Sequence, residues 1–119
     1  MLLFKKKFLD AIRSGEKTQS IRLWTHCRMK AGMRSYIPGV GYIRIESVEP
    51  VALDRLSDED ARPDGFATAE ALRAELVQIY EESPDVSLTP YRVVFSVFPP
   101  EDQAQMKRER QERKRLAEK

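Results

Sequence analysis

A short polar run, Gly15-Glu16-Lys17-Thr18-Gln19-Ser20-Ile21-Arg22, holds an ammonium, two hydroxyls and a guanidinium within six residues. Side chains alternate between the two faces of an extended strand, so Ser20 and Arg22 are expected side by side, about 7 Å apart. Lys17 lies in the turn before them. A phosphate or a polarised carbonyl over these residues could contact all three side chains. The run therefore predicts an anion or carbonyl site, although an exposed edge strand with solvated charges has the same pattern.

Lys17 and Ser20 are also compatible with nucleophilic chemistry. A lysine that is partly withdrawn from water loses its charge more readily, and it can then accept a proton from a hydroxyl. A carboxylate such as Glu70, near the start of a predicted helix, would orient the lysine or carry the proton to a leaving amine. The alternative is structural: Lys17 and Glu70 form an ordinary ion pair, and Ser20 only donates or accepts a hydrogen bond.

Three residues that follow the run, Trp24, His26 and Arg28, are candidates for ligand contacts. Tryptophan stacks on nucleobases, a contact worth about 1–3 kcal/mol per base, but a lone tryptophan in a small barrel is more often partly buried packing. Arg28 could follow a phosphate backbone, and His26 is expected in a loop that lines the same pocket. One histidine beside one cysteine cannot supply a zinc site, so we expect no metal and no cofactor.

The surrounding sequence predicts the elements that position these residues. Phe4, Phe8 and Ile12 recur every four residues, as in an amphipathic helix, and Gly15 is a typical helix stop. Strands are predicted over residues 18–24, 33–37, 42–48 and 91–98. Ser57 is predicted to cap a brief helix and Thr68 a longer one, which ends before Ser83-Pro84.

The run from Lys17 to Arg22, after Gly15, resembles the signature G-x-K-T-x-T/S-x-R of the ASCH domain, a small β-barrel related to the PUA RNA-binding domain. Asp64-Gly65-Phe66, a helical stretch that ends at Ile79-Tyr80, and a closing strand extend the resemblance to short bacterial ASCH proteins, over residues 2–98. The resemblance implies an α+β fold, a small PUA-like β-barrel with flanking helices, and RNA or a nucleoside or nucleotide as the partner.

One branch of the ASCH domains resembles amidohydrolases that act on acetylated cytidine. For that branch the resemblance implies an active group of the motif lysine, the hydroxyl residue three positions later and a glutamate near the start of the later helix. Lys17 and Ser20 match, with serine where the branch commonly has threonine. Glu70 takes the third position if the Asp-Gly-Phe motif sets the register, whereas Ile79-Tyr80 would place Ala71 there.

The 119 residues are 41% hydrophobic, enough for one modest core, and their charges are unevenly distributed. Residues 1–44 carry ten Lys or Arg residues against two acids, whereas residues 45–100 carry four against twelve. This separation suggests a positive surface around the motif, although interdigitated barrel strands could instead bring the opposite charges together. The resemblance implies an ASCH domain over residues 1–100. Residues 101–119 are expected to be a charged helix or a disordered tail, whose interleaved acids weaken its field.

Cys27 is the single cysteine, so an intramolecular disulfide is ruled out and a cytoplasmic location is favoured. No apolar run approaches the roughly 18–20 residues of a membrane span, which predicts a soluble protein with no membrane partner.

Together these features predict an RNA- or nucleotide-binding ASCH domain with a basic cleft centred on Lys17, Ser20 and Arg22. The predicted ligand contacts also include Thr18, Trp24, His26 and Arg28. The alternative is an enzyme acting in the same cleft, either a small amidohydrolase for an acylated nucleoside such as N4-acetylcytidine, with Lys17, Ser20 and Glu70 as catalytic residues, or a ribonuclease.

Overall fold

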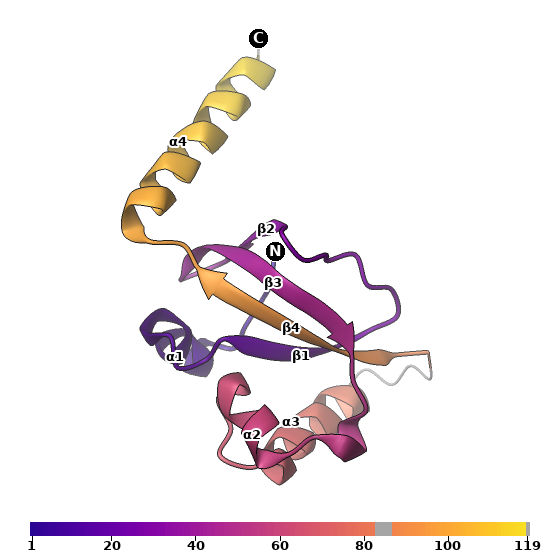
Figure 1. The fold of residues 1–119 in the computed structure, drawn as a ribbon. Coiled ribbons are helices and arrows are strands. Elements are labelled where there is room, and N and C mark those ends of the chain that lie inside the picture. Colours follow the sequence, from indigo (N-terminus) through magenta and orange to yellow (C-terminus); the bar gives the residue numbers. More distant parts are fainter. Residues whose placement is uncertain (83–86, 119) are drawn as a thin grey trace.

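The computed structural model of the chain describes residues 1–82 and 87–118 and is built around an antiparallel sheet (Figure 1). The strands are β1 (Gln19–Trp24), β2 (Arg34–Ile37), β3 (Gly41–Pro50) and β4 (Thr89–Val97), in the order β1-β4-β3-β2. The α-helices are α1 (Leu9–Ser14), α2 (Asp58–Ala61), α3 (Ala69–Glu82) and α4 (Pro100–Ala117). Short 3-10 turns form η1 (Lys6–Phe8), η2 (Leu53–Arg55) and η3 (Arg62–Asp64). The predicted α+β class is confirmed.

A β-barrel was predicted, but the four strands of the described residues form an open sheet. β1 pairs only with β4, and β2 only with β3, so both are edge strands. β2 has four residues, and its outer edge is occupied by the N-terminal segment, where the Leu2 amide donates to the Tyr36 carbonyl at 3.0 Å. β1 and β2 thus lie at opposite edges of the sheet and do not pair with each other, as a closed barrel would require.

Local signals in the sequence begin and end several elements as predicted. Gly15 adopts a left-handed conformation, with φ of 85°, at the end of α1. Ser57 and Asp60 form a reciprocal capping box at the start of α2, and the Thr68 hydroxyl accepts from the Ala71 amide at the start of α3. The predicted stop of this helix at Ser83-Pro84 lies outside the described residues.

Two apolar clusters flank β1. The first includes Ile12, Ile43 and Phe95 and lies between α1 and the sheet. The second lies under α2 and α3 and includes Leu72 and Ile21, the latter from β1 itself. The motif strand therefore has apolar packing on both sides, with Trp24 against the first cluster and Ile21 in the second.

The charged C-terminal segment forms the helix α4, which projects away from the sheet in Figure 1. Its first turns are anchored. The Gln103 amide nitrogen donates to the carbonyls of Tyr42 and Phe98, its oxygen accepts from the Tyr42 amide at 2.7 Å, and Met106 is buried. Among the described residues, no helix has both the length and the apolar character needed to cross a membrane.

Candidate functional site at the N-terminal motif

Lys17 lies in a buried ion pair. Its side chain is 2% exposed, and its ammonium donates to the Asp64 carboxylate at 2.8 Å and also to the Asp64 backbone carbonyl. Three aromatic rings surround the ammonium, with ring centroids at 4.8 Å for Phe8, 5.7 Å for Phe4 and 5.8 Å for Phe66. Burial lowers the pKa of Lys17, and the neighbouring Asp64 carboxylate opposes that shift.

The same carboxylate also fixes the motif strand. Its second oxygen accepts from the Ile21 amide at 3.0 Å and from the Gln19 side chain at 3.3 Å. Asp64 ends η3, and the next residue, Gly65, has φ of 92°, a conformation that turns the chain back beside the Lys17 side chain. Asp64 therefore couples the turn that carries Lys17 to the strand that carries Ser20 and Arg22.

Arg22 and Ser20 lie side by side on β1, as the strand spacing predicted. The Arg22 Nε donates to Ser20 Oγ at 2.8 Å, and a second guanidinium nitrogen donates to the Leu3 carbonyl at 2.7 Å. The guanidinium lies 4.5 Å from the centroid of the Phe4 ring. Burial lowers the pKa of Arg22, and Asp64 opposes this shift as well.

These side chains line a cavity of about 290 Å³, which we call the Lys17 pocket. Its polar residues include Lys17, Ser20, Arg22 and Glu75, and its remaining wall is largely apolar. Glu75, on α3, accepts from Lys5 at 2.9 Å, and this hydrogen bond lowers the pKa of the Glu75 carboxyl. The pocket thus combines cations, a hydroxyl, the carboxylates of Asp64 and Glu75, and apolar side chains around one space of small-molecule size.

The apolar wall is formed by residues from the N-terminal segment, β1, the loop before α3 and α3 itself: Leu3, Phe4, Phe8, Ile21, Leu23, Trp24, Phe66, Leu72, Leu76 and Ile79.

Four of the predicted site residues, Lys17, Ser20, Arg22 and Trp24, line the Lys17 pocket. Thr18 does not. Its backbone bonds to Pro63 and Phe95, and the residue lines a different depression, which includes Phe95, Ser96 and Val97 of β4.

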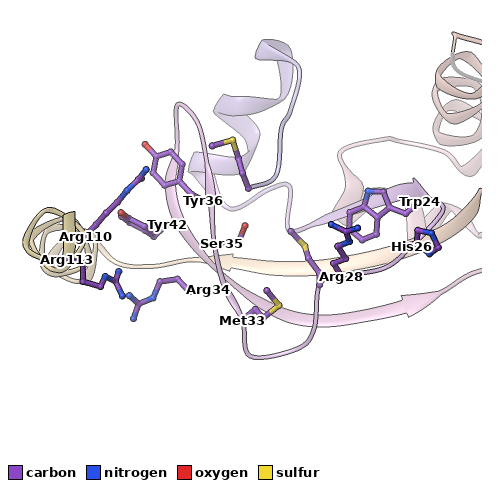
Figure 2. Close-up of a pocket in the computed structure, with 12 residues that line it drawn as sticks. Trp24, His26, Arg28, Met33, Arg34, Ser35, Tyr36, Tyr42, Arg110 and Arg113 are labelled. Carbon is purple, nitrogen blue, oxygen red and sulfur yellow. The ribbon is translucent and has the colours of Figure 1, made fainter. Parts of the chain in front are cut away.

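The remaining predicted site residues lie elsewhere. His26 and Arg28 line a separate groove (Figure 2). Glu70 is exposed on α3 and does not line the Lys17 pocket. The carboxylates brought to Lys17 and Ser20 are those of Asp64 and Glu75.

Sequence reasoning did not identify Asp64 or Glu75 as functional residues, although both left a signal. Asp64 is the first residue of the Asp-Gly-Phe motif, to which no chemical role had been given. Glu75 is three residues after Leu72 and four before Ile79, so it lies on the same face of α3 as these two pocket residues. An acidic residue on the apolar face of an amphipathic helix indicates a buried or functional carboxylate, so this pattern could have identified Glu75.

Comparison with known proteins supports the fold. No model of a known protein family and no curated protein matches the chain. Among solved structures, the chain is similar to a hypothetical protein, PH0355, with a TM-score of 0.67 over 81% of this chain and 95% of that one, at 14% identity.

Two further solved structures are similar at lower coverage. An ASCH domain from Lactobacillus crispatus JV V101 matches with a TM-score of 0.58 and 20% identity, over 75% of this chain and 69% of that one. The protein EF3133 from Enterococcus faecalis V583, assigned to DUF984, matches with a TM-score of 0.57 and 19% identity, over 76% and 69%. The chain has the fold of an ASCH domain, so the resemblance at the motif is confirmed at the level of the fold.

Proposed function

We propose that the Lys17 pocket binds one nucleoside or nucleotide, either free or as an unstacked residue of RNA. The observation that carries this proposal is the meeting of Arg22, Ser20 and Glu75 with apolar side chains in one cavity of about 290 Å³. An aromatic base needs flat apolar walls and a few polar groups that fix its edge. Glu75 can accept from an exocyclic amine, and Lys5, at the rim beside it, can contact a ribose oxygen or a phosphate.

The binding test uses the fluorescence of Trp24, the single tryptophan of the chain, which lines the pocket. Cytidine, uridine, cytidine monophosphate and N4-acetylcytidine are titrated into the full chain. Saturable quenching is expected, and Glu75→Gln should weaken the binding of amine-bearing bases about tenfold, since a hydrogen bond to a charged group is lost. No saturable response to any of the four would contradict the proposal.

Glu70→Gln is the matched control for Glu75→Gln. Both substitutions remove one carboxylate from α3, but only Glu75 lines the pocket. The control should bind nucleosides as the wild type does. If Glu70→Gln weakens binding and Glu75→Gln does not, Glu70 and not Glu75 is the acidic residue of the site.

A second function, hydrolysis of an acylated nucleoside, is favoured by one further observation: Lys17, whose pKa is lowered by burial, shares the pocket with Ser20 and Glu75. In its bond with Arg22 the Ser20 hydroxyl is the acceptor, so its own proton remains available for transfer. Ser20 or a water molecule would attack the acyl carbon, and the neutral amine of Lys17 would take the proton of the nucleophile. Glu75 would then relay this proton from Lys17 to the leaving nitrogen as the amide C–N bond breaks, and in the Ser20 route a water molecule would hydrolyse the resulting acyl-serine ester.

Hydrolysis is tested by incubating the chain with N4-acetylcytidine and separating the products, with a short RNA as a parallel substrate for nuclease activity. The rate of cytidine release should rise with pH through the Lys17 pKa, which lies below its usual value of 10.5, because only the neutral amine accepts a proton. Ser20→Ala distinguishes a covalent route, which it abolishes, from a water route, which retains part of the rate. Binding without turnover of either substrate would leave the binding function and reject the enzymatic one.

A further inference from the structure

We propose that a second surface, the arginine groove, binds a single strand of nucleic acid and leads it to the Lys17 pocket. The groove has a volume of about 590 Å³ and is bounded by the loop after β1, by β2 and β3, and by α4 (Figure 2). Its defining residues are Trp24, Arg28, Arg34, Tyr36, Arg110 and Arg113. The role of the groove as a track rests on the proposed function of the pocket, whereas its affinity for a strand is independent of it.

The groove is cationic because arginines line it and most of them have no acidic partner among the described residues. Four arginines line it, and no Asp or Glu of the described residues does. A neighbouring depression of about 460 Å³ continues along α4 with Lys107, Arg110 and Lys114, and it also has no carboxylate among its described lining residues. Arg34 alone of the groove arginines has an ion pair with a described residue, Glu109, at 3.5 Å.

Helical geometry explains how an interleaved sequence produces a one-sided surface. Lys107, Arg110 and Lys114 are separated by three and four residues, which places them on one face of α4. Glu109 and Glu112 line a different depression, with Gln105, Arg108 and the groove residue Arg113 at its border. The sequence analysis expected the acids of this segment to weaken its field, but in the folded helix they lie largely on another face.

The aromatic residues indicate a strand with accessible base faces. Tyr36 lies edge-on to Tyr42, with ring centroids 5.1 Å apart, and Trp24 lies 5.9 Å from Tyr91, so each ring is held in place by a neighbour. Rigid, half-exposed rings between arginines can stack on bases while the guanidinium groups contact phosphates. A duplex keeps its base faces stacked internally and cannot use such rings.

Trp24 connects the two sites, because it lines both the arginine groove and the Lys17 pocket. Figure 2 shows Arg110 and Arg113 at one end of the groove and Trp24, His26 and Arg28 at the other. A strand that enters at α4 and passes along the groove therefore reaches the side of β1 that carries Ser20 and Arg22. One nucleotide of that strand can leave the stack at Trp24 and enter the pocket.

The experiment measures fluorescence anisotropy of a labelled single-stranded RNA of about twelve nucleotides, within the length range that single-strand binding surfaces cover. The full chain is compared with the double variant Arg110→Ala, Arg113→Ala and with a matched control, Arg108→Ala, Arg115→Ala, on the same helix. The control removes the same charge from residues that do not line the groove. The groove variant should weaken binding at least about tenfold at about 50 mM salt, and the control by no more than about twofold.

The salt dependence gives a second readout. Removing two phosphate contacts should lower the slope of log affinity against log salt by about 1.4, since each contact with a single strand contributes about 0.7. Equal weakening by both double variants would overturn the proposal, because net charge alone would then account for binding. Duplex RNA bound as tightly as the single strand would also overturn it, since the aromatic residues would then have no role.

A single-stranded DNA of the same sequence distinguishes RNA from DNA as the strand that the groove accepts. The nucleoside titration of the Lys17 pocket, repeated on the groove variant, keeps the two proposals separate. Unchanged nucleoside binding with lost strand binding supports the groove as a distinct surface. A wild-type chain that binds nucleosides but no strand overturns the groove, and one that binds strands but no nucleoside overturns the pocket.

Discussion

The Lys17 pocket and the arginine groove both gather positive charge, but they hold it in opposite ways. Lys17 is 2% exposed and bonds to a carboxylate at 2.8 Å, within a ring of aromatic side chains. Arg110 and Arg113 are exposed on α4, and no carboxylate in the described part of the chain is within ion-pair distance of either. A buried, paired cation serves the fold and its immediate site. Exposed, unpaired cations can attract a polyanionic ligand before contact and then bind its phosphates.

The difference predicts different responses to salt. Charges inside a pocket are screened little by dissolved ions, whereas exposed charges that replace counterions on a phosphate backbone depend strongly on them. Nucleoside binding at the Lys17 pocket and strand binding at the arginine groove should therefore separate when the same protein is titrated at two salt concentrations.

The largest effect is expected for Asp64→Ala. The substitution leaves the Lys17 ammonium buried without its partner, and removal of one member of a buried pair typically costs about 3–5 kcal/mol. It also removes the acceptor of the Ile21 amide. The free energy of unfolding, measured with urea at pH 7, should fall by about that amount.

Asp64→Asn is the graded control, because it retains an acceptor for the Ile21 amide and loses the charge. Its stability should lie between those of the wild type and Asp64→Ala. A loss below about 1 kcal/mol in Asp64→Ala would contradict the description of Lys17 as a paired, desolvated cation, since that is the range of exposed pairs. At a temperature where the Asn variant is folded, strand binding at the arginine groove should be unchanged.

The sequence was sufficient for features that depend on local periodicity. Alternation along β1 placed Ser20 beside Arg22, and the observed bond of 2.8 Å between their side chains confirms it. The stop at Gly15 and the cap at Ser57 were also predicted correctly, because each depends on the conformation or side chain of one or two neighbouring residues.

Features that depend on distant parts of the chain were not predictable in the same way. Asp64 reaches Lys17 across 47 positions, and no local pattern reports such a contact. Leu2 bonds to the outer edge of β2 at Tyr36, and this contact also joins residues far apart in sequence. For α4 the charge counts were correct, but they did not reveal its one-sided positive surface. That surface depends on which helical face each charged residue occupies, and a net charge does not contain this information.

An intermediate effect is expected for Gln103→Ala, which tests whether α4 must be fixed to the sheet for the groove to act. The side chain makes three hydrogen bonds with Tyr42 and Phe98, so its loss should lower the free energy of unfolding by about 1–3 kcal/mol. Strand binding should weaken as well, because Arg110 and Arg113 would no longer be held beside Tyr36. Gln105→Ala, whose bonds stay within α4, is the control and should change neither quantity.

The smallest effect is expected for Glu75→Gln, and it should depend on pH. The hydrogen bond from Lys5 lowers the pKa of Glu75 below its usual value of 4.5, so the folded chain binds this proton less readily than the unfolded chain does. The stabilising contribution is therefore fully present above about pH 4.5, and it is lost as the pH falls through the lowered pKa.

At pH 7 the wild type should melt about 1–4 °C above Glu75→Gln, the range for a weak ion pair in a chain of this size. Well below the lowered pKa of Glu75 the two melting temperatures should coincide, because the wild-type carboxyl is then also uncharged. Glu70→Gln should melt at the wild-type temperature at both pH values, since that exposed carboxylate has no ion pair with a described residue. A difference in melting temperature that persists unchanged at low pH would mean that Glu75 stabilises the pocket by packing, and its charge would then be free to serve a ligand.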